Sequence, residues 1–238
     1  MDAPRKQYLD AMGIEVWESR PTSSPPVRQE VVPATKLPLS KPAIISSIDA
    51  SAMDWATLER TVAGCEMCPL HATRTQTVFG VGSHSAQWMV IGEAPGADED
   101  RQGEPFVGRA GQLLTEMLRA AGFKRDDVYI ANILKCRPPN NRDPRLDEVN
   151  ACSSYLLRQI ELLQPKLILA VGRIAAQRLL NTDETIGRLR GNVYRFGSTS
   201  VPVVVTYHPA YLLRSPLQKR KSWADLQFAL RVADGEIT

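Results

Sequence analysis

Short apolar runs alternate along the chain with longer segments in which apolar residues recur every three or four positions. Such runs are typical of buried strands, and the longer pattern is typical of helices with one buried face. We therefore predict strands at 77–82, 87–91, 128–134, 167–171 and 201–206, an edge strand at 192–196, and helices at 54–64, 109–121, 147–163, 172–180 and 216–232. Trp223, Leu226 and Leu230 form the expected apolar stripe of the last helix. This alternation predicts an α/β fold, a three-layer α/β/α sandwich around a mostly parallel sheet.

A long loop at residues 92–111 separates the second predicted strand from the helix that follows it. The loop has glycines at 92, 96, 103, 108 and 111, which let a flat ligand approach the main chain, and acidic residues at 93, 98, 99, 100 and 104. The acidic side chains repel phosphate, and the glycine spacing matches no nucleotide-binding motif. Ligands in such folds bind at the carboxyl ends of the strands, where we also expect Asn132 and His208. We predict a site for a neutral or polar ligand, with Phe106 as its flat face.

Composition separates the N-terminal segment from the rest of the chain. Seven prolines, at 4, 21, 25, 26, 33, 38 and 42, fall within residues 1–50, which we expect to be a mobile arm that binds an unknown partner or none. Residues 51–238 are expected to form a single domain. The net charge of +3 is only mildly basic, so nucleic-acid binding would require clustered Lys and Arg. Without a secretory signal or a membrane-length apolar run, we expect a cytoplasmic protein with no membrane contact.

The four cysteines of the chain, Cys65, Cys68, Cys136 and Cys152, comprise one close pair and two distant residues. Two disulfides are unusual in an intracellular protein, and the spacing does not resemble that of a redox enzyme. Metal binding explains the pattern better than four unrelated buried thiols. The spacing alone is compatible with zinc and with a four-cysteine iron–sulfur cluster, and it does not choose between them.

Four segments together resemble one known family: GEAPG at 92–96, GEPFVGRAG at 103–111, NILKCRPPNNR at 132–142 and HPAYLLR at 208–214. They are similar to the family 4 uracil-DNA glycosylases, iron–sulfur enzymes that remove uracil from DNA, and the similarity covers about residues 54–232. The resemblance implies a glycosylase-like catalytic domain with a 4Fe-4S cluster on the four cysteines. It implies a uracil pocket formed by the acidic loop, including Gly92, Glu93 and Ala94, together with Phe106, Asn132 and His208. We expect the protein to be a monomer. Its expected partner is uracil-containing DNA, single- or double-stranded.

The residue types suit this chemistry. A base must leave the duplex stack before its glycosidic bond can be reached, and Phe106 is the candidate stacking face. The Asn132 amide can distinguish uracil from cytosine. It offers an acceptor to uracil N3–H and a donor to O4, whereas cytosine would place an acceptor against the acceptor and a donor against the donor. Taken singly, Phe106 could equally be a core aromatic and Asn132 a strand-end cap.

Cleavage leaves negative charge on the base and positive charge on the sugar, so a donor near O2 and a carboxylate near the sugar would both help. His208 is the donor candidate. Glu93 is the first choice of carboxylate and Glu99 the second, with Glu99 alternatively lining the pocket against a thymine methyl. Ala94 departs from the aspartate that a related glycosylase family has at this position.

Residues beyond the pocket are candidates for holding DNA. Asn141 and Arg142 lie in the third matching segment, and Leu212 is a possible wedge into the gap left by a flipped base, if it is not a core anchor. The cations Arg214, Lys219, Arg220 and Lys221 could hold phosphates or could be a solvated helix face. Two other function classes stay open: a non-catalytic iron–sulfur nucleic-acid-binding protein and a zinc-stabilised interaction module.

Overall fold

The computed structural model describes residues 48–197 and 201–237, so the predicted arm lies almost entirely outside the described residues. Its main elements are α2 (Trp55–Ala63), β1 (Val81–Gly82), β2 (Trp88–Gly92), α3 (Ala97–Gln102), α4 (Arg109–Ala120), β3 (Tyr129–Asn132), α5 (Leu146–Leu163), β4 (Leu167–Val171), α6 (Arg173–Leu180), α7 (Ile186–Leu189), β5 (Tyr194–Arg195), β6 (Pro202–Thr206), α8 (Pro209–Arg214) and α9 (Lys219–Ala233). Ala50 is buried and Ile48 packs against the same core, so both residues contribute to the packing of the domain.

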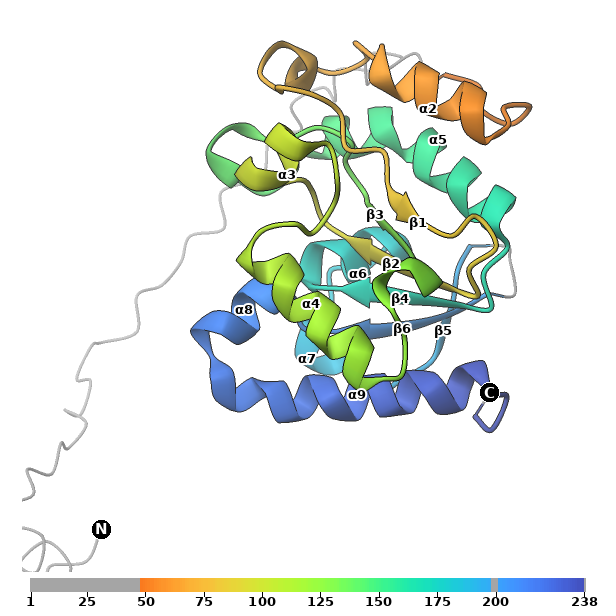
Figure 1. Ribbon diagram of the computed structural model, residues 1–238, viewed down its shortest axis with the longest axis vertical. Coiled ribbons are helices and arrows are strands. Elements are labelled where there is room, and N and C mark those ends of the chain that lie inside the picture. Colours follow the sequence, from red (N-terminus) through yellow and green to blue (C-terminus); the bar gives the residue numbers. More distant parts are fainter. Residues whose placement is uncertain (1–47, 198–200, 238) are drawn as a thin grey trace, which may run out of the picture. The chain divides into compact units, whose positions relative to one another are not determined.

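The six strands form one sheet in the order β1-β3-β2-β4-β6-β5 (Figure 1). The four inner strands are parallel and both edge strands run antiparallel to their neighbours. Gly92 at the end of β2 lies opposite Asn132 at the end of β3. Since parallel strands end at the same edge, the segments that follow β2, β3, β4 and β6 converge there.

Helices cover both faces of the sheet, because successive strand residues point to opposite faces. Met89 and Ile91 belong to the apolar cluster that includes α2, α5 and α6. Trp88 and Val90 belong to the opposite cluster, which includes α4 and α9. The predicted three-layer sandwich is confirmed. No helix among residues 48–197 and 201–237 has the length and apolar character needed to cross a membrane.

Several sequence predictions need correction. The acidic loop contains a short helix, α3, which its sequence does not announce by any apolar periodicity. The predicted strand at 77–82 shrinks to β1, and the last helix begins at Lys219, after a short 3-10 turn. Trp223 is 39% exposed, because α9 buries Ser222, Asp225 and Leu226 instead. The segment after His208, for which the sequence analysis predicts neither a helix nor a strand, is the helix α8.

We predict that Gly111→Ala destabilises the protein, because α4 begins against the backbone of Phe106. A Cβ at residue 111 would lie 1.8 Å from the Phe106 carbonyl oxygen, so one of the two segments must move. The expected loss of unfolding free energy is roughly 1–3 kcal/mol.

The matched control is Gly187→Ala in α7, where a Cβ would meet nothing within 4 Å. This control should keep or slightly raise the melting temperature. Equal melting temperatures for the two variants in a thermal unfolding experiment would contradict the packing at Gly111.

Candidate functional site

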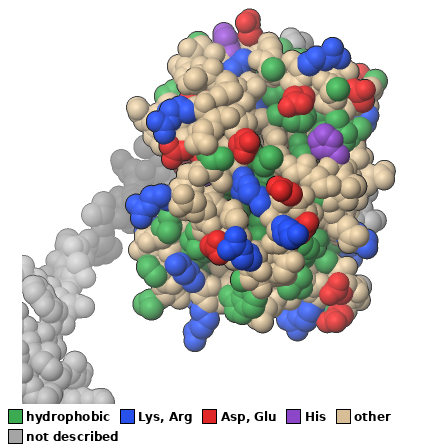
Figure 2. Space-filling view, in the orientation of Figure 1, with side chains coloured by type: hydrophobic (Ala, Val, Ile, Leu, Met, Phe, Trp, Pro, Cys, Tyr) green, Lys and Arg blue, Asp and Glu red, His purple; other side chains and the backbone are tan. Residues whose placement is uncertain are grey.

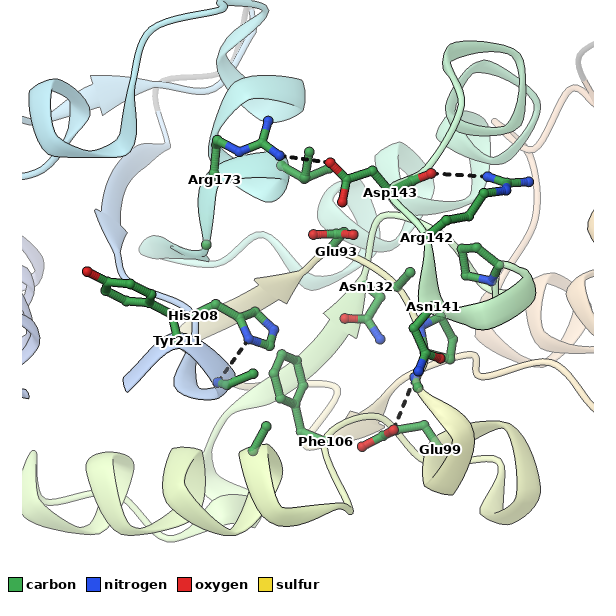
Figure 3. Close-up of a pocket in the computed structure, with 18 of the residues that line it drawn as sticks. Glu93, Glu99, Phe106, Asn132, Asn141, Arg142, Asp143, Arg173, His208 and Tyr211 are labelled. Atoms are coloured by element: carbon green, nitrogen blue, oxygen red, sulfur yellow. Dashed lines mark hydrogen bonds and ion pairs between the residues drawn. The ribbon is translucent and has the colours of Figure 1, made fainter. Parts of the chain in front are cut away.

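A cavity of about 810 Å³ opens at the carboxyl ends of the parallel strands. Its lining includes the following residues that the sequence had singled out: Glu93, Ala94, Glu99, Phe106, Asn132, Asn141, Arg142, His208 and Arg214 (Figure 3). The cavity therefore draws on the loop after β2, the end of β3, the loop before α5 and the start of α8. Residues more than a hundred positions apart in the chain meet in one place.

Gly92 has no side chain, which allows Asn132 and Phe106 to approach its backbone closely. A Cβ on Gly92 would stand 2.4 Å from Asn132 Oδ1 and 2.5 Å from Phe106 Cζ. Phe106 has a φ of 55°, an uncommon value for an aromatic residue, which the surrounding structure must enforce. The absence of a side chain at residue 92 thus brings an aromatic ring and an amide to one wall.

The Asn132 side chain lacks a hydrogen-bond donor for its Oδ1 among the described residues. The side chain is only 2% exposed. A buried acceptor without a partner costs about 1–3 kcal/mol, so such groups usually have a purpose. Figure 3 shows this amide pointing into the cavity, on the same wall as Phe106. A ligand with an N–H at this position would satisfy it.

His208 lies two residues after β6 and caps α8, and its neutral ring is held in one tautomer. Its Nδ1 accepts a hydrogen bond of 3.2 Å from the Ala210 amide, so the neutral ring carries its proton on Nε2. Burial, with a smaller contribution from the Arg214 charge, lowers the pKa of His208 to about 4, and the Glu99 charge opposes the shift. The ring lies 5.6 Å from that of Phe106, measured between centroids. His208 is therefore a neutral donor at neutral pH.

Glu93 is a carboxyl group of the cavity with a raised pKa. Burial, with a smaller contribution from the Asp143 charge, raises this pKa to about 7, and the Arg173 charge opposes the shift. Asp143 and Arg173 form an ion pair of 2.8 Å beside it, as Figure 3 shows. Sequence reasoning missed this pair, although Arg173 lies two residues after the end of β4, where a site residue was to be expected.

Glu99 has a different role in the same loop. Its carboxylate accepts hydrogen bonds from the backbone amides of Gly96, Val107 and Gly108, at 3.1, 3.0 and 3.0 Å. These three bonds fold the acidic loop around the start of α3 and over to the start of α4. The carboxylate is thereby committed to the loop backbone, which favours Glu93 over Glu99 as the group that acts on a water molecule.

The four cysteines meet at a second, small cavity. Cys65, Cys68, Cys136 and Cys152 all line it, between the end of α2, the segment after β3 and α5. Burial raises the pKa of the Cys152 thiol to about 12. No group of three or more His, Cys, Asp or Glu in the described part of the chain has the arrangement that a single metal ion requires.

Two cations border this second cavity. Arg74 Nη1 donates to Cys136 Sγ at 3.2 Å and to the Cys65 carbonyl at 2.7 Å. Lys135 is 1% exposed, and its backbone N–H donates to Cys152 Sγ at 3.3 Å. Spacing had identified the cysteines but neither cation.

The candidate DNA contacts separate into two groups. Arg142 makes a bidentate ion pair with buried Glu148, and Asn141 Oδ1 accepts a hydrogen bond from Arg137, so both side chains are engaged within the protein. Arg214, Lys219, Arg220 and Lys221 are exposed, and their side chains form no ion pair with any residue that the structure describes. Lys and Arg side chains gather over the lower half of the face in Figure 2, where α4, α8 and α9 lie in Figure 1.

The wedge prediction for Leu212 does not fit its burial. Leu212 is 1% exposed, because α8 turns this side chain inward, whereas the adjacent Leu213 is 37% exposed. The core-anchor interpretation therefore applies to Leu212. Leu213 is the apolar side chain that this helix presents to solvent.

Comparisons with known proteins all point to the same protein family. The uracil DNA glycosylase superfamily profile matches residues 79–227. The chain is 49% identical over 175 residues to the type-4 uracil-DNA glycosylase of Archaeoglobus fulgidus, covering 71% of this chain and 87% of that protein. It is 45% identical over 180 residues to the type-4 enzyme of Pyrobaculum aerophilum, covering 73% and 92%. The type-4 enzyme of Thermotoga maritima is 47% identical over 154 residues, 63% of this chain and 79% of that protein. The chain therefore belongs to the uracil DNA glycosylase superfamily and, within it, to the type-4 uracil-DNA glycosylases.

Proposed function

We propose that this protein takes uracil out of single- or double-stranded DNA and hydrolyses its N-glycosidic bond, releasing free uracil and leaving an abasic site. The observation that carries the proposal is the buried, unpartnered Oδ1 of Asn132 in a cavity walled by Phe106 and neutral His208. A flipped uracil offers the N–H that this acceptor lacks, and its flat ring suits the aromatic wall.

Recognition of the base would rest on the Asn132 amide. Its Oδ1 accepts from uracil N3–H and its amide nitrogen donates to O4, whereas cytosine presents an acceptor to Oδ1 and a donor to the amide. Because the side chain is 2% exposed, water cannot easily replace a missing partner. Discrimination against cytosine would therefore follow from leaving buried polar groups unpaired.

Bond cleavage would divide between His208 and Glu93. The departing uracil gathers negative charge on O2, which the Nε2–H of His208 can stabilise, since Nδ1 is already an acceptor. The sugar gathers positive charge, and a Glu93 carboxylate can orient and deprotonate the attacking water. A pKa of about 7 is well suited to a group that must take up a proton at neutral pH.

The four cysteines would hold a 4Fe-4S cluster. They converge on one cavity, which supports a shared metal group, and the resemblance to the family 4 enzymes implies that this group is a 4Fe-4S cluster. When bound, the cluster would supply a covalent link between the segment after α2 and the segment after β3.

We predict that Asn132→Asp lowers kcat/KM for uracil release roughly 10- to 100-fold, because a donor to O4 becomes a second acceptor while the shape is kept. Release should be measured on oligonucleotides that differ only in carrying uracil or cytosine, and the preference for uracil should shrink. Unchanged rate and preference would remove Asn132 from the pocket.

The raised pKa of Glu93 predicts a pH-dependent gain in stability for Glu93→Gln. The folded protein binds this proton more tightly than the unfolded chain, whose carboxyl titrates near 4.5, so the wild-type fold loses stability as the pH rises from about 4.5 to about 7, and the loss is complete above that range. The variant should be more stable than the wild type at about pH 8, and the difference should vanish near pH 4.

Denaturant unfolding at both pH values measures this difference, and the exposed Glu236→Gln serves as control. A stability difference for Glu93→Gln that is the same at both pH values would contradict the shifted pKa.

Replacement of Lys219, Arg220 and Lys221 by Ala should weaken DNA binding for every sequence. The slope of log affinity against log salt should become shallower by about 0.9 for each phosphate that the variant no longer neutralises, while release from saturated enzyme changes little. Exposed Lys166→Ala is the control, because it precedes β4 and so lies at the sheet edge opposite the site. A salt slope equal to that of the wild type would make these cations a solvated helix face.

A further inference from the structure

Lys135 is a buried ammonium group without a carboxylate partner. It is 1% exposed, and its Nζ donates to the Asn132 carbonyl at 2.9 Å and to Gln159 Oε1 at 2.6 Å. Both acceptors are neutral, and no ion pair is formed by Lys135 within residues 48–197 and 201–237. Burying a charge is costly unless an opposite charge compensates it. A negative charge near the Lys135 ammonium group would therefore stabilise the folded protein.

The nearest source of negative charge is the cysteine cavity, which Lys135 lines. Its own N–H donates to Cys152 Sγ, and Cys136 is its neighbour in the chain. Four thiolates around a cluster carry a net negative charge, whose stability and reduction potential depend on nearby cations and on hydrogen bonds to sulfur. Arg74 faces the same cavity through Cys136 Sγ. Two cations thus border the thiols.

The Lys135 ammonium group also contacts the end of β3, where Asn132, the proposed uracil-binding residue, lies. Its Nζ bond to the Asn132 carbonyl closes the end of β3, and the next two amides, of Ile133 and Leu134, bond to the carbonyls of Gly92 and Glu93 at 3.0 and 3.1 Å. The acceptor Gln159 is itself fixed, since its Nε2 donates to the Phe79 carbonyl and to the Tyr129 hydroxyl. Arg74 has no hydrogen bond to this strand end within the described residues.

We propose that Lys135 is a positioning residue that couples the cysteine-bound cluster to the placement of Asn132. The thiolate charge holds the ammonium in place, and the ammonium holds the backbone from which the uracil-reading amide projects. The inference rests on the proposed cluster, and it adds a link between the cofactor and base selection that passes through one side chain.

The test compares three substitutions of a cation by Met: Lys135→Met, Arg74→Met and, as matched control, exposed Lys166→Met. Each purified protein is assayed for iron content, for the reduction midpoint of its cluster and for kcat/KM on uracil and cytosine oligonucleotides. Loss of a cation beside the cluster should make the midpoint more negative in the first two variants and leave it unchanged in the third.

The kinetic arm separates the two cations. Lys135→Met should lose about tenfold in kcat/KM for uracil and part of its preference over cytosine. Iron-loaded Arg74→Met should keep both, because Arg74 does not reach the Asn132 strand end. A Lys135→Met protein with wild-type midpoint and preference overturns the coupling, as does equal loss of preference in both variants.

Wild-type protein stripped of iron that keeps the rate and the uracil preference of the iron-loaded protein would overturn the coupling but not the glycosylase function. If Lys135→Met does not fold, amide hydrogen exchange of the wild type with and without iron replaces it. Removal of iron should speed exchange at Ile133 and Leu134 about tenfold more than at Ala170 in β4. Equal acceleration at all three amides would overturn the proposal.

Discussion

Gly92 ends β2, and any other residue there would place its Cβ 2.4 Å from Asn132 Oδ1 and 2.5 Å from Phe106 Cζ. The pocket depends on this close approach. Because the ring and the amide share one wall, a planar base can meet a stacking face and a hydrogen-bond reader at once. The strain of Phe106, the commitment of Glu99 to three backbone amides and the packing of Gly111 all serve to keep the loop in this conformation.

The electrostatics of the site follow from the same enclosure. Burial keeps His208 neutral, with its proton on the nitrogen that faces away from the Ala210 amide. Burial also raises the pKa of Glu93 to about 7, where the carboxyl can both hold and release a proton near neutral pH. One group is thus suited to donate to the departing base and the other to accept from water, and neither needs a change of fold to do so.

Much of this arrangement could be predicted from the sequence, because the inner strands are short apolar runs and because Asn132 and His208 lie at or just after the ends of two of them. Other features depend on packing that no local pattern reveals. The acidic segment of α3 lacks apolar periodicity, and only the orientation of α8 decides which of Leu212 and Leu213 is buried. The pairing of Arg173 with Asp143, and of Lys135 with Gln159, joins residues 24 to 30 positions apart. The prediction for Trp223 is wrong, since the apolar stripe of α9 is shifted by polar Ser222 and Asp225, which face inward.

The arrangement of the cavity suits recognition of a flipped uracil and cleavage of its bond to the sugar. Both roles can be tested by incubating the wild-type protein with matched oligonucleotides that carry uracil, thymine or cytosine at one position and measuring the free base by chromatography. We expect release of uracil with little or no thymine or cytosine, since thymine carries an extra methyl group and cytosine mismatches the donor and acceptor of the Asn132 amide. Tight binding of the uracil strand without release of the base would contradict this expectation.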